Sequence, residues 1–166
     1  MLVKDYVFVK KTLVDIISKE QYNLEIPNNE LEIVSGNASK GADWLGEKFA
    51  REHNLSLKLF PADWKNMTPP VIIGHNTYGE YNKLAGTNRN KQMSNYIREG
   101  NNNIVIAFDA EESKTKTGTK DMIKISKKAG FKVYHIKCTN REKIKIKIYN
   151  NGESHESTFD LVKRIQ

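Results

Sequence analysis

The stretch Leu31-Glu32-Ile33-Val34-Ser35-Gly36-Asn37-Ala38-Ser39-Lys40-Gly41-Ala42-Asp43 predicts a buried strand, a glycine loop and the start of a helix. Such a turn leaves backbone N–H groups free at the helix start, and these groups together with the helix dipole favour a bound phosphate. An ordinary strand-to-helix turn is the alternative, because one Gly-x4-Gly motif is weak evidence by itself. The loop is not a P-loop, because Ala42-Asp43 stands where Lys-Ser/Thr is required.

Composition predicts a single domain over residues 1–166, with 38% hydrophobic residues and a mean hydropathy of −0.64. No apolar stretch approaches the roughly 20 residues that cross a bilayer, and the N-terminus lacks the layout of a secretory signal. A lone cysteine, Cys138, excludes an internal disulfide and fits a reducing compartment. We therefore expect a cytoplasmic protein with no membrane partner.

The formal net charge of +7 is concentrated in one segment. Residues 114–147 contain 12 Lys/Arg and 2 Asp/Glu, so the rest of the chain has 15 basic and 18 acidic residues. A basic segment of this kind can attract nucleic acid or phosphorylated ligands. A solvated lysine-rich surface is the alternative, because arginines and interleaved aromatic residues are scarce there.

Hydrophobic periodicity predicts strands that alternate with helices. The expected helices cover 5–19, 39–53, 83–99 and 120–129, and the expected strands cover 31–34, 55–60, 104–108 and 131–136. Alternation of this kind favours a Rossmann-like three-layer α/β/α sandwich with a mostly parallel sheet, over a core of about 5–137. The strictly alternating segment 143–149, the turn Asn150-Asn151-Gly152 and a partner strand at 157–162 predict an appended C-terminal β-hairpin, about 143–162.

Three polar or glycine-rich loops, at 35–43, 61–90 and 109–119, each follow a predicted strand. Ligands of open α/β sheets bind at the carboxyl ends of the strands, so these loops are expected to meet at one edge. The segment 61–82 is expected to be irregular, because Pro69-Pro70, Gly74 and Gly79 interrupt it. The convergence of the three loops predicts a binding site.

The chain resembles the YspA-like (cpYpsA-related) branch of the SLOG superfamily over roughly residues 31–136. The resemblance is carried, in order, by Ser35-Gly36-x4-Gly41-Ala42-Asp43, Phe60-Pro61-Ala62-Asp63-Trp64, Ala85-Gly86-x2-Arg89-Asn90-x2-Met93, Ile106-Ala107-Phe108 and Gly118-Thr119-x-Asp121-Met122. It implies a Rossmann-like protein that binds a nucleotide or a nucleotide-derived ligand, such as ADP-ribose, an NAD-like dinucleotide or a nucleoside monophosphate. The branch is frequent in phages and mobile elements, which suggests sequestration of a signalling nucleotide.

Two departures from the family affect this expectation. The family begins with a central strand and a glycine loop, whereas only Met1–Lys4 precede the first helix here. We expect the C-terminal hairpin or another subunit to replace that strand, which favours a homo-oligomer, unless the chain is a truncated form. The superfamily's LOG enzymes, which are phosphoribohydrolases, carry Pro-Gly-Gly-x-Gly-Thr-x-x-Glu, and only Gly118-Thr119 of that motif is present.

Eleven residues are predicted to bind the ligand: Ser35, Gly36, Asn37, Ser39, Lys40, Gly41, Asp43, Arg89, Asn90, Gly118 and Thr119. Backbone N–H groups at 36–41 and 118–119 would hold phosphate, and the Arg89 guanidinium can add two hydrogen bonds. If the protein is an N-glycosidase, Arg89 and Asp121 are the predicted catalytic residues, with Asp121 stabilising an oxocarbenium ion. Asp43 could instead cap a helix, and Asp121 could instead place charge at a helix N-terminus. The motifs imply no cofactor, and no Cys/His cluster predicts a metal.

Overall fold

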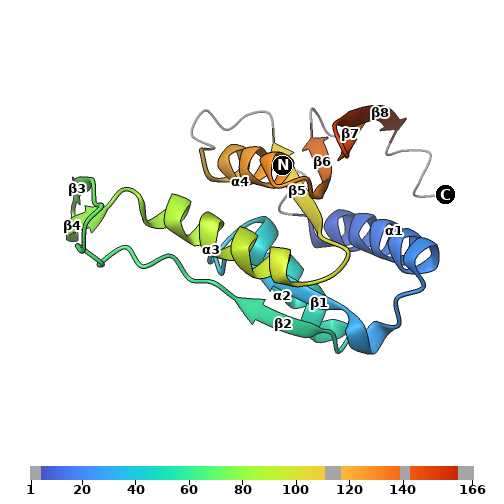
Figure 1. The fold of residues 1–166 in the computed structure, drawn as a ribbon, viewed down its shortest axis with the longest axis horizontal. Helices are drawn as coiled ribbons and strands as arrows, with labels where there is room; N and C mark the ends of the chain where they lie inside the picture. Colours follow the sequence, from blue (N-terminus) through green and yellow to red (C-terminus); the bar gives the residue numbers. More distant parts are fainter. Residues whose placement is uncertain (1–4, 111–116, 139–142, 161–166) are drawn as a thin grey trace.

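The structure is a computed structural model that describes residues 5–110, 117–138 and 143–160 (Figure 1). The helices are α1 (Tyr6–Leu24), the short 3-10 helix η2 (Asn28–Glu30), α2 (Ala42–Glu52), α3 (Ala85–Glu99) and α4 (Thr117–Lys128). The strands are β1 (Glu32–Ser35), β2 (Ser56–Leu59), β3 (Ile73–Asn76), β4 (Gly79–Asn82), β5 (Ile104–Ala110), β6 (Lys132–Cys138), β7 (Lys143–Asn150) and β8 (Glu153–Asp160). The elements expected from periodicity are present, with ends that shift by a few residues.

The strands divide among three small sheets rather than forming one. β1 pairs with β2 in parallel, and Ile33 lies opposite Leu57. β5 pairs with β6 in parallel, and β7 and β8 continue this sheet in antiparallel pairing. The fold is therefore mixed α/β, as expected, but the strands do not pair into a single, mostly parallel sheet.

α1 packs against one face of the β5–β6 sheet because its apolar residues recur at spacings of three and four. The Asp5 carboxylate caps the helix by accepting hydrogen bonds from the N–H groups of Val7 and Phe8. The larger core cluster joins this helix to α2 and to the sheet, and its buried members are Phe8, Val9, Leu13, Ile16, Leu45, Phe49, Phe108, Tyr134, Ile136, Ile144 and Ile146.

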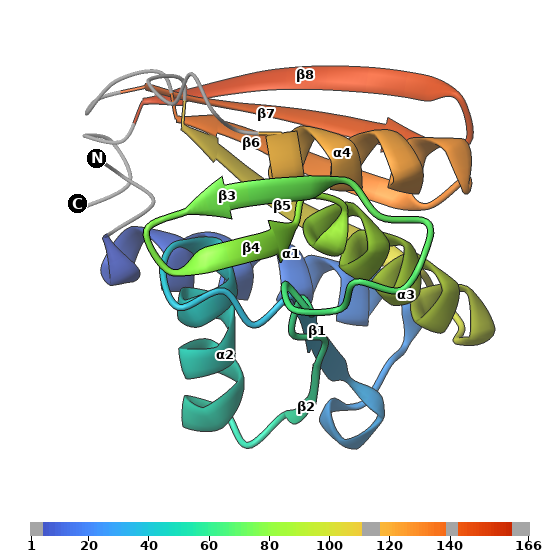
Figure 2. The same cartoon turned by 90° about the vertical axis from the view of Figure 1, so that its left-hand side faces the viewer.

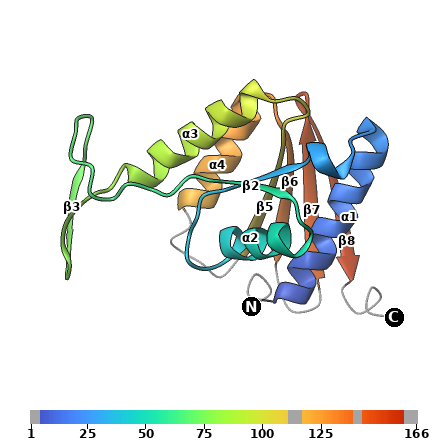
Figure 3. The same cartoon turned by 90° about the horizontal axis from the view of Figure 1, so that it is seen from below.

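α4 covers the opposite face of the same sheet. The alternating side chains of β5 divide between the two faces, since Phe108 belongs to the α1 cluster whereas Val105 and Ala107 belong to a second cluster with Ile123 of α4. Figure 3 shows β5 and β6 between α1 on one side and α4 on the other. This two-sided cover explains why 104–108 is a nearly continuous apolar run.

The segment 61–82 is not wholly irregular, which corrects the prediction. β3 and β4 form an antiparallel hairpin at 73–82, and Figure 2 shows them side by side. Asn76 starts the turn by accepting a hydrogen bond from the N–H of Tyr78, and Gly79 has a φ of 110° that favours glycine. Strands of four residues are too short to show a clear alternation. Figures 1 and 3 both show the hairpin at the end of the molecule farthest from β8.

The predicted C-terminal hairpin is present as β7 and β8, joined at Asn151 and Gly152, which both have positive φ. β7 pairs with β6, so the hairpin lies at the far edge of the four-stranded sheet. It therefore does not occupy a position between β1 and β5. Of the replacements expected for the family's central strand, the hairpin is therefore wrong, and another subunit stays a prediction.

Candidate functional site

The loop after β1 is anchored to α2 by a buried carboxylate. The Ser35 hydroxyl donates to Glu47 Oε1 at 2.8 Å, and the Asn37 side-chain amide donates to the same carboxylate at 3.2 Å. The backbone N–H of Asn37 also donates to Ser35 Oγ at 3.1 Å. Asn37 itself has a positive φ of 53°. Ser35 is only 3% exposed. Its hydroxyl therefore holds the loop, whereas the prediction used it as a phosphate donor.

Gly36 lies against the guanidinium of Arg89, which comes from α3. Arg89 Nη1 donates to the Gly36 carbonyl oxygen, and the same nitrogen lies 3.5 Å from Asp43 Oδ2. A Cβ at position 36 would lie 1.8 Å from Arg89 Nη1, so only glycine permits this approach. The Arg89 side chain is 16% exposed, which places a partly buried cation beside the loop.

The N-terminus of α2 is open toward solvent. Gly41 precedes the helix with φ 79° and ψ −146°, a conformation that is essentially restricted to glycine. Within the described part of the chain, no side chain caps this helix end. Ser39 and Lys40 are exposed next to it. Asp43 is not the cap; its carboxylate accepts a hydrogen bond from the N–H of Ala38 at 3.2 Å and so closes the loop.

Asn90 connects Arg89 to α4. Its side-chain oxygen accepts from Arg89 Nε at 2.9 Å, and its side-chain nitrogen donates to Asp121 Oδ2 at 2.9 Å and to the Gly118 carbonyl oxygen at 3.1 Å. Asn90 is buried, so these partners satisfy its amide group. Asp121 lies in the second turn of α4, where its carboxylate faces Asn90. Its alternative role as a charge in the first helical turn is therefore not what the geometry shows.

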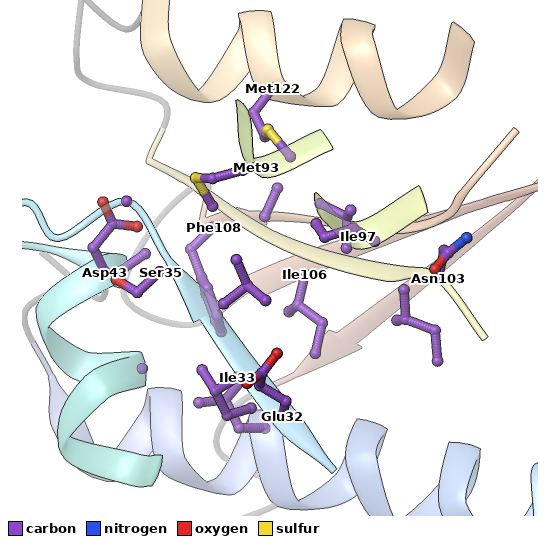
Figure 4. Close-up of a pocket in the computed structure, with 18 of the residues that line it drawn as sticks. Glu32, Ile33, Ser35, Asp43, Met93, Ile97, Asn103, Ile106, Phe108 and Met122 are labelled. Atoms are coloured by element: carbon purple, nitrogen blue, oxygen red, sulfur yellow. The ribbon is translucent and has the colours of Figure 1, made fainter. Parts of the chain in front are cut away.

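A cavity of about 1340 Å³ joins these features. Its polar end is formed by Ser35, Gly36, Ala38, Ser39, Lys40, Gly41, Asp43, Arg89, Asn90, Gly118 and Thr119. Its inner part is apolar, and Figure 4 shows Ile33, Ile106 and Phe108 there, with Met93 and Met122 from the covering helices. Both methionines also pack in or against the core.

The predicted site residues therefore lie close together at the polar end of the cavity, and they differ in how far they are exposed to solvent. Ten of the eleven predicted ligand-binding residues line the cavity, and Asn37 is the exception. Asn37 is held by Glu47 and is exposed, and it is absent from the lining. The two predicted catalytic residues, Arg89 and Asp121, both bind the side chain of Asn90.

Sequence reasoning missed Glu47, the buried anchor of the loop. Its side chain is 5% exposed and also pairs with Arg51 at 3.3 Å. Position 47 lies nearly opposite Leu45 and Phe49 around α2, beside Ala50 at the margin of the buried face, where a glutamate usually faces water. The pattern contains no signal that would separate it from a solvated residue.

The described part of the basic segment lies on α4, β6 and β7. Lys120, Lys124 and Lys128 are exposed, while Lys127 Nζ lies 3.9 Å from the centroid of the Tyr149 ring. Nucleic-acid binding through residues 114–147 stays a prediction, and residues 114–116 and 139–142 lie outside the described ranges. No helix in the described ranges is both long and apolar enough to cross a membrane. Those ranges also contain no group of three or more candidate metal ligands.

Comparisons with protein-family models, with curated proteins and with solved structures found no match to this chain. The SLOG resemblance therefore stays a prediction, and the geometry of the site is what supports a function.

Proposed function

We propose that this protein binds a nucleotide or a nucleotide-derived ligand at the polar end of the cavity. One observation carries the proposal: the glycine loop, the uncapped start of α2 and the Arg89–Asn90 pair all line that end. Helix N-termini and glycine loops favour anions, and an arginine supplies a fixed cation with several donors. A phosphate with an attached polar group matches this set of donors.

The geometry suggests which groups of the site bind the phosphate and which bind the ribose or base. The N–H groups at 41–43 and the exposed Ser39 and Lys40 side chains are placed for a phosphate or pyrophosphate. Gly41 leaves room for it, because a Cβ there would meet nothing within 4 Å. Gly118 and Thr119, in the first turn of α4, lie on the other side of Arg89 and Asn90 and are suited to a ribose or base.

The same proposal includes a Rossmann-like fold and membership of the SLOG superfamily. Parallel β1–β2 and β5–β6 pairs, each with an intervening helix, support a Rossmann-like arrangement with ligand binding at the carboxyl ends of the strands. The ordered motifs between Ser35 and Met122 support membership of the YspA-like branch of SLOG. Sequestration of a signalling nucleotide is the role that this membership suggests.

Calorimetric titration with AMP, ADP-ribose and NAD tests the proposal. Binding of at least one ligand is expected, and Lys40→Ala should weaken it about tenfold, which corresponds to about 1.4 kcal/mol. Lys128→Ala is the matched control, because Lys128 is exposed in the last turn of α4. Absence of binding at millimolar concentrations of all three ligands would contradict the proposal.

An N-glycosidase is the second candidate, because Asn90 holds both Arg89 and Asp121. Asp121 is not among the residues that line the cavity, so a ribose would have to bind close to Asn90 for this carboxylate to stabilise the developing oxocarbenium ion. Incubation with AMP and NAD, followed by chromatography, should then release free base, and Asp121→Asn should abolish the release. Tight binding without product would favour sequestration instead.

A further inference from the structure

Trp44 is a large aromatic residue of the cavity that the proposed site does not yet use. It lies in the first turn of α2, directly after Asp43, and it is one of the residues that line the cavity. Trp44 is 47% exposed, and it belongs to neither of the two core clusters of the described residues. Its indole ring is therefore available for contact with a ligand at the polar end of the cavity.

The surroundings of Trp44 leave room for a second flat ring. Within the described part of the chain, no other aromatic ring packs against Trp44. Its charged neighbour is Lys48, one turn later on α2, with Nζ 5.9 Å from the centre of the indole ring. The same Nζ lies closer to the ring of Tyr6 in α1, at 4.1 Å. Because cation–π contacts weaken beyond about 6 Å, Lys48 is held mainly by Tyr6.

Trp44 and the start of α4 lie at opposite ends of the polar part of the cavity. Lys48 contacts both Trp44 and Tyr6, so Trp44 is on the side of α1. Gly118 is in the first turn of α4, and its carbonyl accepts from Asn90. α1 and α4 cover opposite faces of the β5–β6 sheet, as Figure 3 shows. The glycine loop and the start of α2 therefore lie between Trp44 and Gly118.

This order of groups matches a ligand with three parts. In the proposed function, the start of α2 takes phosphate, and Gly118 and Thr119 take a ribose or base. Trp44 adds a flat apolar surface beyond the phosphate position. Nucleobases stack on such surfaces because every base has a π face. A mononucleotide fills two of the three positions, whereas two nucleosides joined by a pyrophosphate fill all three.

We propose that Trp44 is a base-stacking residue and that the ligand is a dinucleotide, with two nucleosides joined by a pyrophosphate. The inference rests on the proposed function, because the pyrophosphate takes the position at the start of α2. The second base stacks on the exposed indole ring of Trp44. The ammonium of Lys48 beside this ring favours an uncharged base such as adenine over a cationic ring, since like charges repel.

Diadenosine pyrophosphate and ADP-ribose are the matched probes. They differ in one group, because adenine in the first replaces the anomeric hydroxyl of the terminal ribose in the second. Calorimetric titration is expected to show about tenfold tighter binding of diadenosine pyrophosphate, as the stacking of one base predicts. Trp44→Ala should remove this preference and leave the affinity for ADP-ribose nearly unchanged. Trp44→Phe keeps an aromatic ring and should retain most of the preference.

Tryptophan fluorescence reports the stacking directly. The chain has two tryptophans, and Trp64 is 50% exposed and lies outside the cavity lining. Trp64→Phe therefore leaves Trp44 as the single indole without changing a residue of the site. In this variant, diadenosine pyrophosphate should quench the emission saturably, because a base stacks on the ring. ADP-ribose should leave the emission nearly unchanged.

The outcomes separate this inference from the proposed function. Equal affinity of the wild type for the two probes, or an equal loss of both in Trp44→Ala, would overturn the stacking role and leave the proposed function intact. Binding of neither probe would contradict both. If Trp44→Ala does not fold, quenching in the Trp64→Phe protein still decides the result, and binding of diadenosine pyrophosphate without quenching would overturn the role of Trp44.

Discussion

Gly36 is the residue on which the geometry of the polar site depends most directly. Its carbonyl accepts from Arg89 Nη1, and a Cβ at this position would meet the guanidinium at 1.8 Å. Gly36→Ala must therefore displace Arg89 and break its contacts with Gly36 and Asp43. We expect a loss of about 1–3 kcal/mol in unfolding free energy, measured by urea denaturation.

Gly46→Ala is the control for this substitution. Gly46 lies inside α2, and an added Cβ meets nothing within 4 Å. This variant should be more stable than the wild type by about 0.5–1 kcal/mol, because alanine favours helix. If Gly36→Ala and Gly46→Ala changed the unfolding free energy equally, the close approach of Arg89 would not matter.

Tyr134 predicts how stability changes at high pH. Burial, with a further contribution from Glu20, raises the pKa of the Tyr134 hydroxyl well above 10. The unfolded chain therefore loses this proton near pH 10 while the folded chain keeps it. The contribution to stability is complete below pH 10 and falls above it, by up to about 1.4 kcal/mol per pH unit.

Tyr134→Phe isolates this effect. It should cost about 1–2 kcal/mol at pH 8, because a hydrogen bond to the buried Glu20 is lost. It should also flatten the fall in unfolding free energy between pH 10 and 11. Burial and Glu52 raise the pKa of Tyr6 to about 12, so some slope remains from that residue. An unchanged slope in the variant would show that Tyr134 titrates normally.

Among the elements, α2 fixes the conformation of the loop that follows β1. Glu47 accepts from Ser35 and Asn37, and Asp43 accepts from Ala38, so the loop returns to the helix at three points. Glu47→Ala leaves two polar side chains without their partner and should cost about 2–3 kcal/mol in unfolding free energy. Amide exchange at Asn37 and Ala38 should accelerate in this variant.

Glu52→Ala on the same helix is the comparison, because its carboxylate pairs with Lys10 at the surface. It should shift the urea midpoint less than Glu47→Ala and leave exchange in the loop unchanged. Faster loop exchange in both variants would mean that general loosening of α2, and not the Glu47 contacts, is the cause.

The sequence predicted some elements well because their signals are local. The turn at Asn150-Asn151-Gly152 depends on neighbouring residues only, and it is present between β7 and β8. The meeting of Gly36, Arg89 and Gly118 followed from strand direction alone. Burial of Glu47 could not be predicted, because it depends on a contact with Ser35 twelve residues earlier.

At the scale of the whole molecule, the division of the sheet was the feature that local patterns could not predict. Alternating strands and helices indicate parallel pairing, but they do not predict which strand lies next to which in the sheet. Among the described residues, no strand pairs with both β1 and β5, and the C-terminal hairpin lies on the far side of β6. The polar site therefore lies at one end of the cavity between β1 and β5, with the anion donors at the carboxyl ends of these strands.

An NMR titration of the ¹⁵N-labelled protein with ADP-ribose tests the central claim most directly, because each amide reports its own environment. We predict saturable shifts that concentrate at 36–43, at Arg89 and Asn90, and at Gly118 and Thr119. Absence of shifts at millimolar ADP-ribose, or shifts confined to the exposed lysines of α4, would contradict a nucleotide site at the carboxyl ends of β1 and β5.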